Sequence, residues 1–175
     1  MPIMWDAGKR MATGHIARAN MQWKVGAGRG LIVLAGPEAY VSPSFYPSKQ
    51  EHGKTVPTWN YEAVHLSGLV EWFDDAARLE DVVRELSVLH EHDRAQPWAI
   101  ADAPRPYIDA LLRGIVGVEM RVERIDAKRK LSQNKSAGDF AGVIAGLDAE
   151  GAAAPVEVAA LMRATRAMSD DPSGN

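Results

Sequence analysis

Two different hydrophobic periodicities meet in the middle of this sequence, and together they restrict the fold most strongly. Residues 56–73 alternate apolar and polar side chains, which predicts a β-strand with one face in water. In residues 75–92 the apolar side chains recur every three to four positions, which predicts an amphipathic helix. Residues 115–125 return to alternation and predict a second strand. We therefore expect an α+β domain whose long strands twist and curl toward a barrel.

Other segments complete the predicted order of elements. Residues 31–35 and 38–42 predict two short strands that pair with each other. Three further segments have helical patterns: 105–112, 137–147 and 156–168. With 175 residues the chain is long enough for one domain. We assign residues 1–148 to that domain and residues 149–175 to a helical or disordered tail.

Composition excludes several classes of function. The chain has no cysteine, which excludes disulfides, thiolate chemistry and cysteine zinc sites. The five histidines include no pair spaced four apart, so no metal site is predicted. A net charge of −3 argues against non-specific binding of nucleic acid. Neither an apolar run of membrane-spanning length nor a signal peptide is present, and we expect a cytoplasmic protein.

The segment from Thr13 to Trp23 is the first candidate site. His15, Arg18 and Gln22 recur at spacings of three and four, which predicts a helix with Thr13 as its N-cap. A helix N-terminus with an arginine one turn further on is suited to a phosphate group. The alternative, which local chemistry favours, is an ordinary surface arginine beside a partly buried histidine.

Two later segments combine polar and aromatic or basic side chains. In residues 54–61, Trp59 and Tyr61 share one face of the expected strand, and Thr58 and Asn60 share the other. Such a mixture is typical of a cofactor cleft, although packing of a strand end would need the same residues. Residues 128–134 are basic and polar, which indicates either an anion contact or a solvated loop.

Together these segments resemble the PaiB family of FMN-binding negative transcriptional regulators. The matching strings occur in order over most of residues 14–147. They are GHIARAN at 14–20 with Gln22-Trp23, GPEAYVSPSFYPSKQEHGKTVPTWNYEAVHLSG at 36–68, PWAIADAP at 97–104, LLRGIVGVEM at 111–120, KLSQNKS at 130–136 and AGVIAGL at 141–147. Met21 departs from the family, which usually has proline there.

The resemblance implies an FMN-binding split β-barrel, generally a homodimer that holds FMN at the subunit interface. It assigns the cofactor contacts to three motifs. The first motif comprises His15, Arg18 and Asn20, the second Thr58, Trp59 and Asn60, and the third Lys130, Ser132 and Gln133. The family normally has an additional amino-terminal stretch with early barrel strands, so we expect this chain either to be a shortened form or to start at an internal methionine.

The resemblance favours an FMN-binding protein that acts in negative control of transcription. Direct binding of DNA stays open, because the sequence has no helix–turn–helix pair with a basic recognition helix. An FMN-dependent oxidoreductase on the same barrel, similar to a flavin reductase or an oxidase, is the first alternative. A module that binds no flavin and only dimerises or binds a partner is the second. No catalytic residue is assigned.

Overall fold

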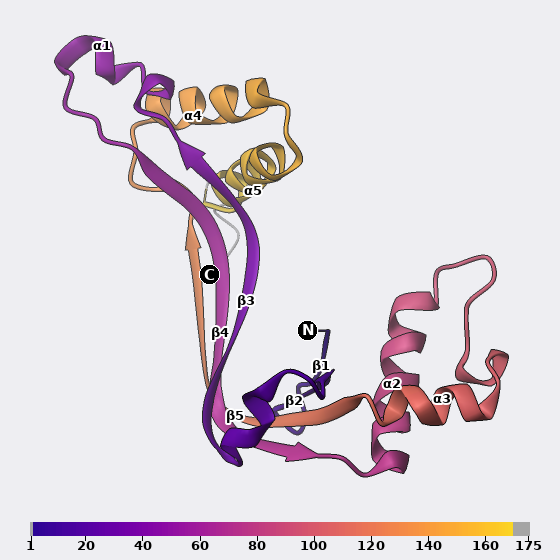
Figure 1. Cartoon of the computed structure of the whole chain (residues 1–175). Coiled ribbons are helices and arrows are strands. Elements are labelled where there is room, and N and C mark those ends of the chain that lie inside the picture. The colour runs from indigo at the N-terminus through magenta and orange to yellow at the C-terminus, as the bar shows by residue number, and fades with distance from the viewer. Residues whose placement is uncertain (1, 170–175) are drawn as a thin grey trace. The chain divides into compact units, whose positions relative to one another are not determined.

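The computed structural model describes residues 2–169, with the backbone alone for residues 167–169. Its five strands form one antiparallel sheet in the order β1-β2-β5-β4-β3, and helices flank the sheet (Figure 1). The strands are β1 (Ile3–Asp6), β2 (Met11–Ala17), β3 (Gly28–Val41), β4 (Thr58–Phe73) and β5 (Ile115–Lys130). The helices are α1 (Ser48–His52), α2 (Ala76–Glu91), α3 (Arg105–Leu112), α4 (Ala137–Glu150) and α5 (Ala153–Ser169). The predicted α+β class is confirmed.

The predicted helix over residues 13–23 is wrong. Residues 11–17 form β2, which pairs antiparallel with β5 from Met11 opposite Arg121 to Ala17 opposite Ile115. Alternate residues Ala12 and Gly14 are buried, as a strand requires. Only the short 3-10 helix Met21–Val25 follows. The spacing of polar residues fits a helix locally, but a partner strand about 100 residues away determines the conformation.

The two short strands predicted at residues 31–35 and 38–42 are one continuous strand, β3. Gly36 lies within β3 and does not turn the chain. A Cβ there would lie only 3.1 Å from the Cβ of Glu62 on β4, so a larger residue would crowd the neighbouring strand. Pro37 lies within β3, which is at the edge of the sheet, where strands tolerate proline. Similarly, β5 continues to Lys130, so the predicted basic loop is shorter than expected.

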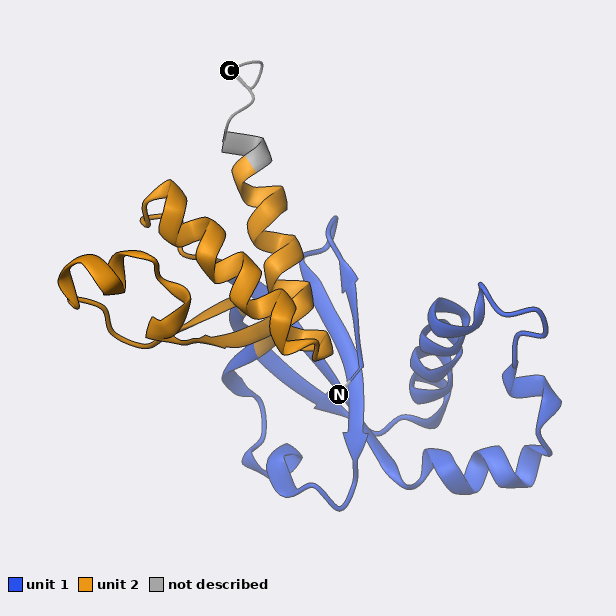
Figure 2. Ribbon diagram, turned by 90° about the horizontal axis from the view of Figure 1, so that it is seen from above, with its two compact units in different colours: residues 1–32, 66–125 blue, residues 33–65, 126–175 orange. Residues whose placement is uncertain are grey.

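The chain divides into two compact units (Figure 2). Unit 1 comprises residues 1–32 and 66–125, and unit 2 comprises residues 33–65 and 126–175. In unit 1, Leu79 of α2 packs with Ile108 and Leu112 of α3. Strands β3, β4 and β5 each have residues in both units.

Helices α4 and α5 build the core of unit 2. Its buried side chains are Ala39, Val41, Tyr46, Leu131, Phe140, Val143, Leu147, Val158, Ala159 and Met162. Three of these come from α5, in the segment assigned above to a tail. The domain boundary at residue 148 stays a prediction, and residues 170–175 lie outside the described residues.

Candidate functional site

The second and third motifs meet in unit 2. The Lys130 ammonium, at the end of β5, donates to the Thr58 hydroxyl and to the Trp59 carbonyl at the start of β4. The sheet order places β4 beside β5, which brings together residues 72 positions apart in the chain. A cation and a hydroxyl thus lie together at this end of the strand pair.

Trp59 adds an exposed aromatic surface to this group. Its side chain is 51% exposed, and its ring meets the ring of Tyr40 on β3 edge to face, with centroids 5.9 Å apart. Tyr40 is itself 45% exposed. Large aromatic rings in water are surfaces on which a planar ligand can stack.

Asn60 and Ser132 lie behind this surface and are buried. The Asn60 amide donates to the Ser132 hydroxyl at 3.0 Å and to the Met162 sulfur of α5 at 3.4 Å. The Ser132 hydroxyl in turn donates to the Asn60 carbonyl oxygen at 3.1 Å. Asn60 is 0% exposed, so its side chain bonds to the protein and reaches no solvent.

Gln133 stabilises the turn that follows β5. Its side-chain oxygen accepts from the Leu131 N–H at 2.7 Å, and its amide donates to the Arg129 carbonyl at 2.9 Å. Ser132, within this turn, has a left-handed backbone with φ 61°. The polar atoms of Gln133 are therefore used locally, although the residue is exposed.

The first motif lies in unit 1, where Arg18 binds the backbone. Its Nε donates to the Arg113 carbonyl at 2.9 Å and one Nη donates to the Ile115 carbonyl at 3.1 Å. The other Nη lies 3.6 Å from the Asp74 carboxylate. Arg18 therefore ties the end of β2 to the start of β5.

His15 and Asn20 differ from each other in their surroundings. Among the described residues, none bonds to the buried Nδ1 of His15. Burial lowers the pKa of His15 below its ordinary value of 6.5. Asn20 is exposed and caps the following 3-10 helix, since its side-chain oxygen accepts from the Gln22 N–H at 3.1 Å. In the part of the chain that the structure describes, the first motif thus contains one buried polar atom without a partner, Nδ1 of His15.

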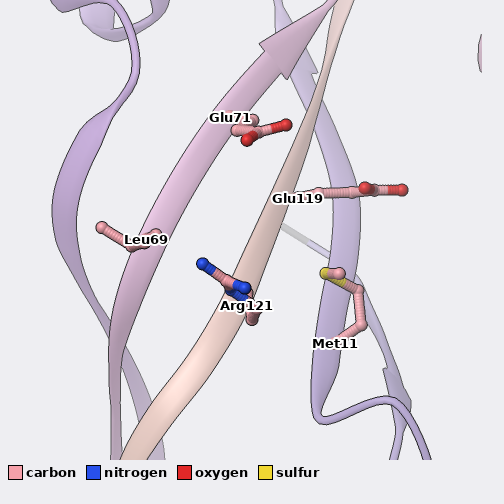
Figure 3. A pocket seen from close by; sticks show the side chains of 5 residues that line it. All are labelled: Met11, Leu69, Glu71, Glu119 and Arg121. Atoms are coloured by element: carbon pink, nitrogen blue, oxygen red, sulfur yellow. The ribbon is translucent and has the colours of Figure 1, made fainter.

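Three shallow cavities occur in unit 1. One of about 250 Å³ is lined by Met11, Leu69, Glu71, Glu119 and Arg121 on three neighbouring strands (Figure 3). A second of about 250 Å³ includes Arg18, and it is the only one of the three to contain a predicted contact residue. A third, of about 430 Å³, lies between the β1–β2 hairpin and α2.

Sequence reasoning missed the cavity of Figure 3 and the exposed ring of Tyr40. Alternation does place Glu71, Glu119 and Arg121 on the wet face of their strands. However, Glu119 already pairs with Arg78 of α2 at 2.5 Å. Tyr40 lies in a string that resembles the family, but its contact with Trp59 depends on how β3 and β4 pair.

Two kinds of feature are absent from the part of the chain that the structure describes, residues 2–169. No helix there is both long enough and apolar enough to cross a membrane. The same residues contain no group of three His, Asp or Glu side chains that could hold a metal ion. A cytoplasmic location stays a prediction.

A family model described as "Putative FMN-binding domain" matches residues 1–124. This range contains the first and second motifs and ends before the third. An uncharacterised protein of Aspergillus fumigatus is 36% identical over 156 residues, covering 80% of this chain and 60% of that protein. The protease synthase and sporulation protein PAI 2 of Bacillus subtilis is 34% identical over 143 residues, covering 79% of this chain and 65% of that protein. The chain thus spans about 60–65% of the length of these relatives.

Solved structures give weaker similarities. The FAD and heme binding protein from Mycobacterium smegmatis has a TM-score of 0.49 at 11% identity, covering 81% of this chain and 63% of that one. A flavocytochrome from Azotobacter vinelandii has a TM-score of 0.44 at 12% identity, covering 79% and 58%. Similarity at this level supports no functional argument.

Proposed function

Because the chain belongs to the FMN-binding domain family, whose cofactor is FMN, we propose that Thr58, Trp59 and Lys130 contact that cofactor directly. Membership of this family agrees with the predicted resemblance to FMN-binding proteins of the PaiB family and with the predicted cofactor, FMN. The single observation that supports this site is the Lys130 ammonium bonded beside the exposed ring of Trp59.

FMN combines a phosphate, a hydroxylated chain and a planar aromatic ring system. An ammonium and a hydroxyl are donors suited to phosphate, and charge assistance strengthens such bonds. The exposed rings of Trp59 and Tyr40 offer apolar area to a planar ring. The donor set of unit 2 therefore fits the cofactor.

The three motifs contribute in different ways under this proposal. Asn60, Ser132 and Gln133 position the direct contacts, because their polar atoms already bond to the protein. Bound FMN would supply electron transfer, and the protein would bind, orient and shield it. His15, Arg18 and Asn20 remain proposed contacts of their own, and FMN titration of Arg18→Ala tests this first motif.

An FMN titration of flavin-free protein tests this proposal. We expect saturable binding, with quenching of tryptophan fluorescence, and a weaker affinity in Lys130→Ala. Lys128→Ala is the matched control, because Lys128 is an exposed lysine on the same strand. Folded protein that takes up no FMN would exclude the proposal and favour a module that binds no flavin.

A role in negative control of transcription is the second proposed function. Similarity to a Bacillus subtilis protein named for protease synthesis and sporulation favours it. The net charge of −3 favours action through a protein partner over direct contact with DNA. A gel-shift titration with upstream DNA at stated salt tests this, and a salt-sensitive shift would establish direct binding instead.

We also propose that the chain forms a homodimer through the edge strand β3. Val33 and Leu34 on this strand are 54% and 42% exposed, and an edge strand leaves N–H and C=O groups unpaired. Exposed apolar groups beside unpaired backbone suit a second copy of the chain. Sedimentation should show a dimer that Val33→Lys weakens, and a wild-type monomer would exclude the proposal.

A further inference from the structure

We propose that Asn60 is a positioning residue that holds the second and third motifs together and couples them to helix α5. The inference rests on the proposed FMN site, because it assigns a role to a residue behind the contacts. Asn60 itself has no exposed atom, so it reaches FMN only through its neighbours.

The amide of Asn60 joins three separate segments. It lies on β4, directly after Thr58 and Trp59. It exchanges two hydrogen bonds with Ser132, in the turn after β5, and donates a third to Met162 on α5. A buried amide whose donor and acceptor atoms are both bonded fixes its partners, because each lost bond would leave a polar atom unsatisfied.

Ser132 needs such a partner because its backbone is left-handed, with φ 61°. Residues other than glycine seldom adopt this conformation, since the Cβ then approaches the neighbouring carbonyl. The two hydrogen bonds between the Ser132 hydroxyl and the Asn60 amide stabilise this conformation of the serine. A backbone bond from the Lys135 N–H to the Ser132 carbonyl, at 3.0 Å, closes the turn.

Lys130 ends β5 and precedes Ser132 by two residues, so the turn directly continues the strand end that carries the lysine. The Lys130 ammonium bonds to Thr58 and Trp59, the two residues that precede Asn60. The start of β4 and the end of β5 are thus linked in two places. Lys130 links them at the exposed side, and Asn60 links them in the core. Loss of the buried bonds between Asn60 and Ser132 should weaken the bonds of the Lys130 ammonium to Thr58 and Trp59 and so make the ammonium more accessible.

Met162 extends the coupling to a helix outside the residues that the family model matches, 1–124. Its side chain is 0% exposed and packs in the core of unit 2. Replacement by leucine keeps a similar apolar volume but removes the sulfur that accepts the Asn60 bond. We therefore expect Met162→Leu to change the site in the same direction as Asn60 variants, with a smaller effect.

The experiment compares Asn60→Leu with Val143→Ala, a core variant on α4 without a polar link to the site. Amine acylation of Lys130 relative to Lys128 is measured by mass spectrometry in flavin-free protein, and FMN affinity is measured separately. In Asn60→Leu we expect Lys130 to react about threefold faster and FMN to bind about tenfold more weakly. Val143→Ala should leave both unchanged at temperatures where it is folded.

Two further variants keep the test decisive. If Asn60→Leu does not fold, Ser132→Ala removes the two bonds between Asn60 and Ser132 and leaves only the bond from Asn60 to Met162. The double variant Asn60→Leu with Ser132→Gly should restore the slow reaction of Lys130, because glycine accepts the left-handed backbone without help. Rescue of this kind is not expected if Asn60 only fills space.

The outcomes separate this inference from the proposed function. If wild-type protein takes up no FMN but Lys130 still reacts faster in Asn60→Leu, the FMN site is wrong and the positioning role stands. If FMN binds and Lys130 reacts equally in wild type and Asn60→Leu, the positioning role is wrong. Equal changes in Asn60→Leu and Val143→Ala would also overturn it.

Discussion

Unit 1 and unit 2 each contain a predicted cofactor cation, and the two cations are used differently. In unit 1, Arg18 donates to two backbone carbonyls and lies near a carboxylate. In unit 2, Lys130 bonds to a hydroxyl and a carbonyl beside an exposed indole. Arg18 therefore holds two strands together, whereas Lys130 lies at a surface suited to a ligand.

This difference shows that a sequence motif can predict which segment belongs to a site without predicting which of its side chains contact the ligand. The first motif, with Arg18, and the third motif, with Lys130, each contain a cation, an amide and a further polar group, so their sequences indicate similar chemistry. The partners of each side chain distinguish them, and those partners come from strands and turns far away in the chain. The following predictions test this contrast, in order of decreasing effect.

Removal of the Lys130 ammonium should have the largest effect on FMN binding. Lys130→Ala deletes a charge-assisted donor, so we expect the dissociation constant to rise about 10- to 100-fold. Fluorescence titration measures this, with Lys128→Ala as the control that should stay close to wild type. A similar loss in both variants would mean that general charge, and not this site, attracts the cofactor.

Truncation of the exposed indole should have the next largest effect. Trp59→Ala removes a stacking surface, and we expect FMN to bind about 3- to 10-fold more weakly. Trp98→Ala is the control, because Trp98 is a similarly exposed tryptophan of unit 1. Unchanged affinity in Trp59→Ala would remove the aromatic wall from the proposed site.

Arg18→Ala should affect stability more clearly than binding. The carbonyls of residues 113 and 115 would each lose a charged donor, so we expect a loss of about 1–2 kcal/mol in the free energy of unfolding. We also expect weaker FMN binding than in Arg78→Ala, whose arginine pairs with Glu119 on a strand of the same unit. Urea unfolding and FMN titration measure the two effects, and equal FMN affinities would remove Arg18 from the site.

Acidification should lower the stability of unit 1 at a higher pH than that of unit 2. Because burial lowers the pKa of His15, the unfolded chain binds a proton more readily than the folded one below about pH 6.5. Stability that is fully present above this pH should decrease as the pH falls toward the folded-state pKa. Urea unfolding at pH 7.5 and pH 5.5 should show a smaller decrease in His15→Gln, and an identical decrease would contradict the assignment.

Unit 2 should respond at lower pH. The backbone N–H and hydroxyl of Ser48 donate to Asp139, and these bonds lower the pKa of that carboxyl below its ordinary value of 3.8. Stability from this pair is present above about pH 3.8 and is lost as the pH falls through the folded-state pKa. Ser48→Ala should reduce the loss measured between pH 4.5 and pH 2.5, and an unchanged acid profile would count against this pair.

Much of the secondary structure could be predicted from hydrophobic periodicity. The predicted helix at 105–112 matches α3, and the strand at 56–73 matches β4 within two residues. These elements follow a local pattern that burial on one side explains. The segment of β2 could not be predicted in this way, because its conformation depends on the ladder with β5.

The sequence could predict which segments form the candidate site, but not which of their atoms face a ligand. Resemblance to a family selected Thr58, Asn60, Lys130 and Ser132, and the structure brings these four together. Alternation places Trp59 and Asn60 on opposite faces of the strand, but no local pattern shows that the face of Asn60 is the buried one. That distinction depends on α5, which packs behind β4 from a position about 100 residues later in the sequence.

Titration of flavin-free, folded protein with FMN tests the proposed site best when wild type is compared with Lys130→Ala and Lys128→Ala. We expect saturable uptake by wild type and by Lys128→Ala, and a marked loss of affinity in Lys130→Ala alone. Equal affinity in all three proteins, or no uptake by the wild type, would contradict the proposed site.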